Sequence, residues 1–203
     1  VQEVATRDGF QIEAAFVETA EKIRLIDALA AAGFSRIEVS SFVSPKAVPA
    51  LADAAEVFAG IRRRPGTVYV ALVPNPKGAE RALAAKVDEI NLVASVSETH
   101  NRANMGMSPA DSIAGFARIM DSVRGAPVST NATVATAFGC PFEGRMTVPA
   151  LVDFVGKLYD LGIRSFNICD TIGVAYPTQI RETFQALMAA YPDVHFSVHI
   201  HDT

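Results

Sequence analysis

The residues with the clearest chemical potential are two histidines near the end of the chain, His199 and His201, separated by Ile200. Alternate residues of a β-strand point to the same face, so both imidazoles would project together and could bind one metal ion. Three of the four histidines fall within residues 195–201, and this clustering is compatible both with a metal site and with two hydrogen-bonded core histidines. His195 shares their face but would lie at the opposite end of the strand, so we interpret it as structural.

A second group near the start of the chain combines a cation with a carboxylate. Arg7 and Asp8 follow a β-rich segment and precede Gly9. The guanidinium could face a developing oxyanion, and the carboxylate is a hard oxygen ligand for a metal ion. The structural alternative is an ordinary turn with a surface ion pair, because such pairs and Asp-Gly turns are common.

Two further acidic residues, Glu38 and Asp170, are candidates for the same site. Glu38 lies in the middle of an apolar segment, where a carboxylate is costly unless it is paired, and Arg7 or another cation is its natural partner. A purely structural ion pair is the alternative. Asp170 ends another β-rich segment, and Thr171 and Gly173 after it suit a loop that closes over a ligand.

The two cysteines, Cys140 and Cys169, are too few for a disulfide scaffold and suit a reducing compartment. Cys169 has no His, Lys or Arg close in sequence that would favour its thiolate. We therefore interpret Cys169, and with it Cys140, as a small buried apolar residue and not as a nucleophile.

Composition excludes several classes of protein. The chain has 203 residues, 50% of them hydrophobic, and 18 Lys and Arg against 22 Asp and Glu, a net charge of −4. These values disfavour disorder and nucleic-acid binding. The longest uncharged run, residues 125–142, contains prolines and glycines and reads as a buried strand with a loop instead of a membrane span. The opening residues are charged where a signal peptide would be apolar. We expect a cytoplasmic globular protein.

Seven β-rich segments alternate with amphipathic helical segments along the chain. The predicted strands are Val1–Ala5, Arg36–Ser40, Val68–Val73, Glu89–Ala94, Val128–Ala135, Ser165–Cys169 and His195–His201. Helix signals include Thr19 as the cap of a helix that runs to Gly33, Ser108 before a helix that ends at Gly125, and Thr147 before one that ends at Gly162.

Repeated βα units of this kind predict an α/β fold with a parallel sheet. A doubly wound open sheet and a (β/α)8 barrel both fit this order. The chain has no GxGxxG or GxxxxGKS phosphate loop, which counts against nucleotide and dinucleotide enzymes. We expect one catalytic domain over residues 1–203, a (β/α)8 TIM barrel that lacks its last helix–strand–helix. Active sites of such barrels gather at the carboxyl ends of the strands, where Asp8, His199 and His201 would converge. An iron oxygenase is disfavoured because its first two ligands usually come from one His-x-Asp/Glu segment.

Five motifs carry a resemblance to a known family. In chain order they are RDGFQ, IEVSSFVSPKAVP, GCPFEG, DTIGVAYP and HIHDT. Together they resemble the 3-hydroxy-3-methylglutaryl-CoA lyases, which belong to a superfamily of metal-dependent barrel enzymes that includes isopropylmalate and citramalate synthases. The resemblance implies that Asp8, His199 and His201 bind Mg²⁺ or Mn²⁺. It also implies that Arg7 stabilises an enolate formed on the thioester fragment of an acyl-CoA substrate.

The resemblance further implies that Gln11, Glu38 and Asn167 lie around the substrate. The hydroxyl proton of the substrate would pass to His201 or to Asp170. The family's glycine-rich loop with a catalytic cysteine, and an asparagine of the metal shell, would come after residue 203. A Claisen-type acyltransferase of the same superfamily and a non-catalytic truncated relative are the alternatives. The native metal, the exact acyl-CoA and the oligomeric state, for which a homodimer is considered, stay open.

Overall fold

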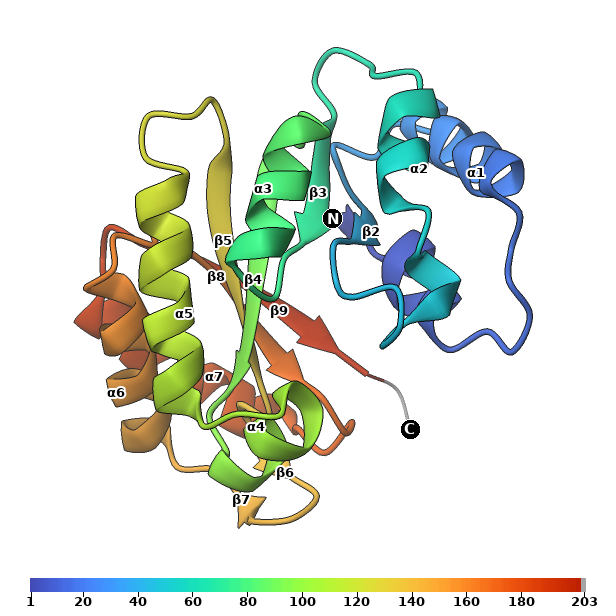
Figure 1. The fold of residues 1–203 in the computed structure, drawn as a ribbon. Coiled ribbons are helices and arrows are strands. Elements are labelled where there is room, and N and C mark those ends of the chain that lie inside the picture. The colour runs from blue at the N-terminus through green and yellow to red at the C-terminus, as the bar shows by residue number, and fades with distance from the viewer. Residues whose placement is uncertain (202–203) are drawn as a thin grey trace. The chain divides into compact units, whose positions relative to one another are not determined.

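The structure is a computed structural model that describes residues 1–201. It divides into two compact units, which are described separately. Unit 1 contains residues 1–91 and 121–129, and unit 2 contains residues 92–120 and those from 130 onward. In both units strands and helices alternate along the chain (Figure 1).

The strands are β1 (Gln2–Glu3), β2 (Arg36–Ser41), β3 (Val68–Leu72), β4 (Glu89–Ser95), β5 (Ser129–Ala135), β6 (Gly139–Cys140), β7 (Gly144–Arg145), β8 (Ser165–Asp170) and β9 (His195–Ile200). The α-helices are α1 (Thr19–Ala31), α2 (Ala54–Gly60), α3 (Pro76–Ala84), α4 (Glu98–Met105), α5 (Pro109–Ser122), α6 (Val148–Tyr159) and α7 (Pro177–Ala190). A π-helical turn, η1 (Ala5–Gly9), and a 3₁₀ turn, η2 (Pro49–Leu51), complete the elements.

The order of the strands confirms the predicted fold class. The main sheet has the order β1-β2-β3-β4-β5-β8-β9, so its neighbours follow one another along the chain, while β6 and β7 form a separate antiparallel pair. The pairs β1–β2, β2–β3, β3–β4, β5–β8 and β8–β9 are all parallel. This succession of parallel strands and connecting helices is that of a (β/α)8 barrel through its seventh strand.

In unit 1, β1 is shorter than the predicted segment Val1–Ala5. The Oε1 atom of Glu3 accepts hydrogen bonds from the backbone N–H groups of Val4 and Ala5, both at 2.8 Å. These amides are therefore not available to a sheet ladder, and the chain turns into η1 directly after Glu3. Arg7 and Asp8 consequently lie in a helical turn that follows the strand.

A buried ion pair fastens α1 to the segment before α2 in unit 1. Lys22 Nζ donates to Asp53 Oδ1 and to the backbone oxygen of Ala50, both at 2.7 Å. Thr19 Oγ1 donates to the other carboxylate oxygen of Asp53 at 2.7 Å. The prediction that Thr19 caps α1 is wrong for this reason: its hydroxyl bonds to Asp53, and Glu18 occupies the cap position without a side-chain bond.

Loss of this ion pair should destabilise the protein. Lys22→Met keeps the length of the side chain but leaves the Asp53 carboxylate, which is 10% exposed, without its cation. We expect the free energy of unfolding to fall by about 3 kcal/mol, as for other buried pairs that lose one member. The matched control is Lys157→Met, which breaks an exposed pair with Asp153 and should cost less than about 1 kcal/mol. Equal losses in urea denaturation would contradict this account.

In unit 2, the remaining part of β4 and the strands β5, β8 and β9 carry the sheet, and α6 packs against α7. Two predicted helix starts are confirmed. Ser108 Oγ accepts from the N–H of Asp111 at 3.1 Å before α5, and Thr147 Oγ1 accepts from the N–H of Ala150 at 3.4 Å before α6. Gly162 has a φ of +92°, the left-handed conformation that a glycine after a helix provides.

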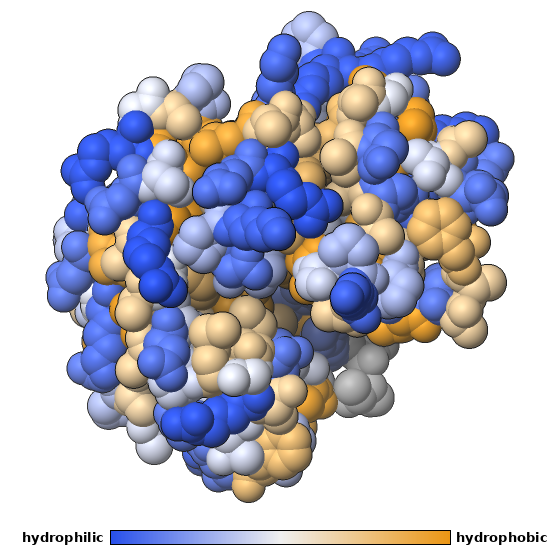
Figure 2. Space-filling view, viewed as in Figure 1, coloured by the Kyte–Doolittle hydropathy of each residue, from blue (hydrophilic) through white to orange (hydrophobic). Residues whose placement is uncertain are grey.

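The face seen in Figure 2 is largely hydrophilic, with hydrophobic side chains scattered among the charged ones. Scattered apolar side chains are normal on a folded surface. Within residues 1–201, none of the helices combines the length and the apolar character needed to cross a membrane.

Candidate active site

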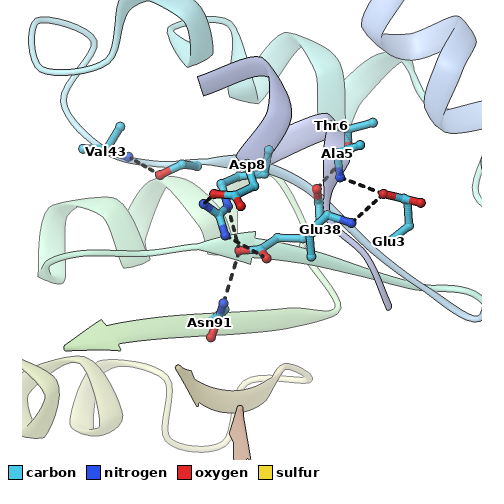
Figure 3. A network of polar contacts seen from close by, with 10 residues as sticks. Glu3, Ala5, Thr6, Asp8, Glu38, Val43 and Asn91 are labelled. Atoms are coloured by element: carbon cyan, nitrogen blue, oxygen red, sulfur yellow. Dashed lines mark hydrogen bonds and ion pairs between the residues drawn. The ribbon is translucent and has the colours of Figure 1, made fainter. Parts of the chain in front are cut away.

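The first polar cluster of the site lies in unit 1, and Figure 3 shows its members Asp8, Glu38 and Asn91. Arg7 joins the two acids of this cluster. Arg7 Nε and Nη2 donate to the two carboxylate oxygens of Glu38 at 3.2 and 3.4 Å, and Nη1 donates to Asp8 Oδ1 at 2.6 Å. The forked guanidinium thus bonds to both acids at once, a geometry that an ammonium group could not reproduce. Arg7 is the partner that the sequence predicted for Glu38.

Glu38 is held from several sides. Its side chain is 2% exposed, and its Oε1 accepts a second hydrogen bond from Asn91 Nδ2 at 3.2 Å. Its backbone oxygen accepts from Thr6 Oγ1 at 2.8 Å, which ties η1 to β2. Asn91 was not among the predicted site residues, although an amide in a strand as buried as β4 is a signal that some polar partner is present.

The electrostatics of the cluster keep the guanidinium charged. Burial works to lower the pKa of Arg7, but the negative charges of Glu38 and Asp8 and the hydrogen bonds to them outweigh it, and the pKa is raised. A cation that is 11% exposed and fixed by two carboxylates is preorganised to face negative charge that develops beside it.

Gln11 follows η1 in unit 1. It is exposed and, with Phe16 and residues 47–50, lines a groove of about 490 Å³ within unit 1. The predicted contact of Gln11 with the substrate therefore stays a prediction.

The second polar cluster lies in unit 2, where β8 and β9 end. The rings of His199 and His201 are 4.6 Å apart between centroids, at an angle of 69°, and both are half-buried. His201 Nδ1 lies 3.0 Å from the backbone oxygen of Thr171. The common face predicted for the two imidazoles is thus observed.

Asp170 and Asn167 lie on β8 in the same unit. Asp170 is 1% exposed, and its carboxylate oxygens accept from the N–H groups of Val174 and Ala175, each at 3.0 Å. Asp170 therefore fixes the loop that follows β8. Asn167 pairs in register with Ser197 of β9, and its Oδ1 accepts from the Ser197 hydroxyl at 3.3 Å.

The two cysteines are buried, as predicted, with Cys140 at 4% and Cys169 at 6% exposure. The Cys140 thiol donates to Ser97 Oγ at 3.0 Å. Ser97 also caps α4, where its Oγ accepts from the N–H of His100 at 3.0 Å. His100 Nδ1 lies 2.6 Å from Ser95 Oγ. Cys140 is thus part of a structural network at the start of α4.

His100 gives this network a pH dependence. Burial lowers the pKa of His100, and the nearby charge of Glu143 only partly opposes this shift. As the pH falls through the ordinary histidine pKa of about 6.5, the unfolded chain therefore binds a proton before the folded one does, and stability decreases. We expect His100→Gln to flatten the fall in melting temperature between about pH 7.5 and pH 5.5. Parallel pH profiles for the two proteins would exclude this role.

The predicted site residues thus form two groups. Arg7, Asp8 and Glu38 contact one another in unit 1. His199 and His201 lie together in unit 2. The three predicted metal ligands are divided between the units, because Asp8 belongs to the first and both histidines to the second.

A sheet whose parallel strands follow one another in chain order, with polar residues gathered near the strand ends, is typical of the barrel enzymes. Within that class, the chain belongs to the HMGL-like family, whose model matches residues 1–203. The family predicted from the motifs is thereby confirmed.

Named relatives of the chain agree with this family assignment. The mitochondrial hydroxymethylglutaryl-CoA lyase of Mus musculus is 41% identical over 203 residues, which are 100% of this chain and 62% of that protein. The 3-hydroxy-3-isohexenylglutaryl-CoA/hydroxymethylglutaryl-CoA lyase of Pseudomonas aeruginosa is 40% identical over 99% of this chain and 67% of its own length. A solved HMG-CoA lyase from Acinetobacter baumannii, in complex with coenzyme A and 3-methylmalate, matches with a TM-score of 0.95 and 46% identity, over 98% of this chain and 65% of that one. The chain therefore spans about two thirds of the length of these relatives.

Proposed function

We propose that the protein is a carbon–carbon lyase that cleaves 3-hydroxy-3-methylglutaryl-CoA to acetyl-CoA and acetoacetate. The observation that carries this proposal is the match over the entire chain to hydroxymethylglutaryl-CoA lyases at about 40% identity. In this reaction the bond between C2 and C3 breaks and its electron pair stays on C2 as a thioester enolate. The C3 hydroxyl loses its proton and becomes the ketone of acetoacetate, and protonation of the enolate at C2 gives acetyl-CoA.

We propose that Asp8, His199 and His201 bind a divalent cation, Mg²⁺ or Mn²⁺. One carboxylate and two imidazoles are a suitable donor set for a divalent metal ion. The bond between His201 Nδ1 and a backbone carbonyl supports this, since metal-binding histidines usually donate their other ring N–H to such a group. When bound, the cation would act as Lewis acid and template for the substrate oxygens.

The roles of the remaining residues follow from their chemistry. Arg7 would stabilise the enolate, because its charged fork is held in place before the negative charge develops. The hydroxyl proton would pass to the carboxylate of Asp170 or to the imidazole of His201, the two basic groups at the ends of β8 and β9. Gln11, Glu38 and Asn167 complete the proposed surroundings of the substrate.

The same proposal includes the substrate class, the cellular compartment and the assembly of the protein. An acyl-CoA substrate is supported by the coenzyme A bound to the Acinetobacter baumannii relative. The name of the Pseudomonas aeruginosa relative extends the substrate class to longer branched 3-hydroxyglutaryl thioesters. We further propose a cytoplasmic protein, in keeping with its two free cysteines, with both units in one catalytic domain and a homodimer as its assembly.

The test is a comparison of two reactions with the same purified protein. We expect release of acetoacetate from 3-hydroxy-3-methylglutaryl-CoA and no release of CoA from acetyl-CoA with 2-oxo acids. The reverse result would identify a Claisen-type acyltransferase of the same superfamily. Absence of both activities, in a protein that melts cooperatively, would favour a non-catalytic relative and contradict the proposal.

A further inference from the structure

Thr136 has an unusual backbone for a β-branched residue. Its φ is +56°, and Lys86 is the other non-glycine residue with a positive φ among residues 1–201. The left-handed region is unfavourable for a β-branched side chain, and such a conformation persists only where the surrounding structure imposes it. Thr136 is 0% exposed and directly follows β5 in unit 2, so this strained position is buried in the fold.

The buried backbone of Thr136 makes a specific contact. Its N–H donates to Thr171 Oγ1 at 2.7 Å, and its own Oγ1 donates to the backbone oxygen of Ala135 at 2.7 Å. One residue later, the N–H of Ala137 donates to the backbone oxygen of Cys169 at 3.1 Å. These bonds connect the segment after β5 to Cys169 in β8 and to Thr171 directly after β8, whose hydroxyl oxygen accepts from Thr136.

Thr171 in turn contacts His201 through its backbone oxygen, 3.0 Å from Nδ1. A carbonyl oxygen carries no hydrogen and can only accept, so the hydrogen of this bond must be on Nδ1. The neutral ring then has its lone pair on Nε2, the atom that can bind a metal or take a proton. Thr171 thus selects the tautomer of His201.

We propose that Thr136 and Thr171 are positioning residues for His201: the bond from Thr136 fixes the Thr171 carbonyl, and this carbonyl holds the imidazole as the Nδ1–H tautomer. The proposal rests on the proposed function, because it assumes that His201 Nε2 is the working atom. Neither threonine touches the substrate in this scheme. In this scheme, the strained backbone of Thr136 is what keeps the metal-binding imidazole of His201 oriented before the metal binds.

The test uses the complete chain and two measurements that do not depend on turnover. In metal-free protein with ¹⁵N-labelled histidine, multiple-bond ¹H–¹⁵N spectra report the tautomer of His201 at about pH 8.5, above the ordinary histidine pKa. Calorimetry reports the affinity for Mn²⁺. The signals of His201 are assigned by their loss in His201→Gln.

We expect wild-type His201 to be the Nδ1–H tautomer. Thr171→Val, which removes the acceptor for Thr136, should give a mixture of tautomers and weaken Mn²⁺ binding by about 10- to 100-fold, the usual effect of losing a group that orients a metal ligand. Thr171→Ser keeps the hydroxyl, so its His201 tautomer and its Mn²⁺ affinity should be those of the wild type. The matched control is Thr183→Val, which removes another buried hydroxyl of unit 2, on α7, and should change neither.

Two results would overturn the proposal. The first is an Nε2–H tautomer of His201 in the wild-type protein, a measurement that requires no variant to fold. The second is an unchanged tautomer and Mn²⁺ affinity in folded Thr171→Val. If the wild type binds no Mn²⁺ while its His201 shows the Nδ1–H tautomer, the proposed metal site fails, and the positioning role of Thr171 is upheld by the spectrum.

Discussion

Replacing Arg7 with glutamine is expected to lower kcat by about 10²- to 10³-fold and to change KM little, since a donor that acts on developing charge contributes mainly in the transition state. Arg7→Lys should recover little of this loss. The guanidinium bonds to Glu38 and Asp8 together, and a single ammonium group cannot hold the same fork. The measurement is kcat and KM for cleavage of 3-hydroxy-3-methylglutaryl-CoA to acetoacetate and acetyl-CoA, normalised to the folded fraction.

A stability loss alone would not identify the role of Arg7. Arg7→Gln also leaves the Glu38 carboxylate without its cation, although the hydrogen bond from Asn91 persists. We therefore include the double variant Arg7→Gln/Glu38→Gln, which removes the stranded charge. If Arg7 acts in catalysis, the double variant should regain the melting temperature of the wild type while its kcat stays low. Recovery of kcat together with stability would show that Arg7 is a structural residue.

Asp8→Ala and His201→Ala are each expected to abolish metal-dependent turnover while the fold persists. Loss of one of three protein ligands should weaken Mn²⁺ binding by at least about 10-fold, by analogy with the 10- to 100-fold effect of losing a group that supports a ligand. In Asp8→Ala the Arg7–Glu38 pair is retained, so the neighbouring contact is preserved. Calorimetry with Mn²⁺ measures the affinity, and the melting temperature monitors the fold.

The control for this prediction is Asp121→Ala, which removes an exposed carboxylate that pairs with Arg124. It should bind Mn²⁺ as the wild type does. Unchanged binding in both Asp8→Ala and His201→Ala would remove the proposed metal site.

Much of the fold could be predicted because its signals are local. The cap at Ser108 and the glycine at position 162 act within one helical turn, and the structure has both as expected. Predictions from local sequence were wrong where a side chain forms a hydrogen bond other than the one expected from its position. Thr19 does not cap α1 because its hydroxyl reaches Asp53, 34 residues away, and β1 is short because Glu3 binds the next two amides.

In the candidate site, too, some contacts could be predicted from local sequence and others could not. The pairing of Arg7 with Glu38 was predictable, because a carboxylate in an apolar strand requires a cation. The spacing of His199 and His201 was enough to predict their common face. The contacts of Asn91 with Glu38, 53 residues away, and of Thr136 with Thr171, 35 residues away, depend on strand register and on a strained backbone. An amide in a buried strand shows that Asn91 needs a polar partner, but no local pattern in the sequence identifies that partner or the partner of Thr136.

The proposed hydroxymethylglutaryl-CoA lyase activity requires a divalent cation. The most direct measurement is release of acetoacetate from 3-hydroxy-3-methylglutaryl-CoA by purified protein before EDTA treatment, after it, and after Mg²⁺ or Mn²⁺ is returned. We predict cleavage that EDTA abolishes and that either cation restores. Cleavage that persists in metal-stripped protein would contradict the proposed role of the metal, and no cleavage in metal-replete, folded protein would contradict the proposed function itself.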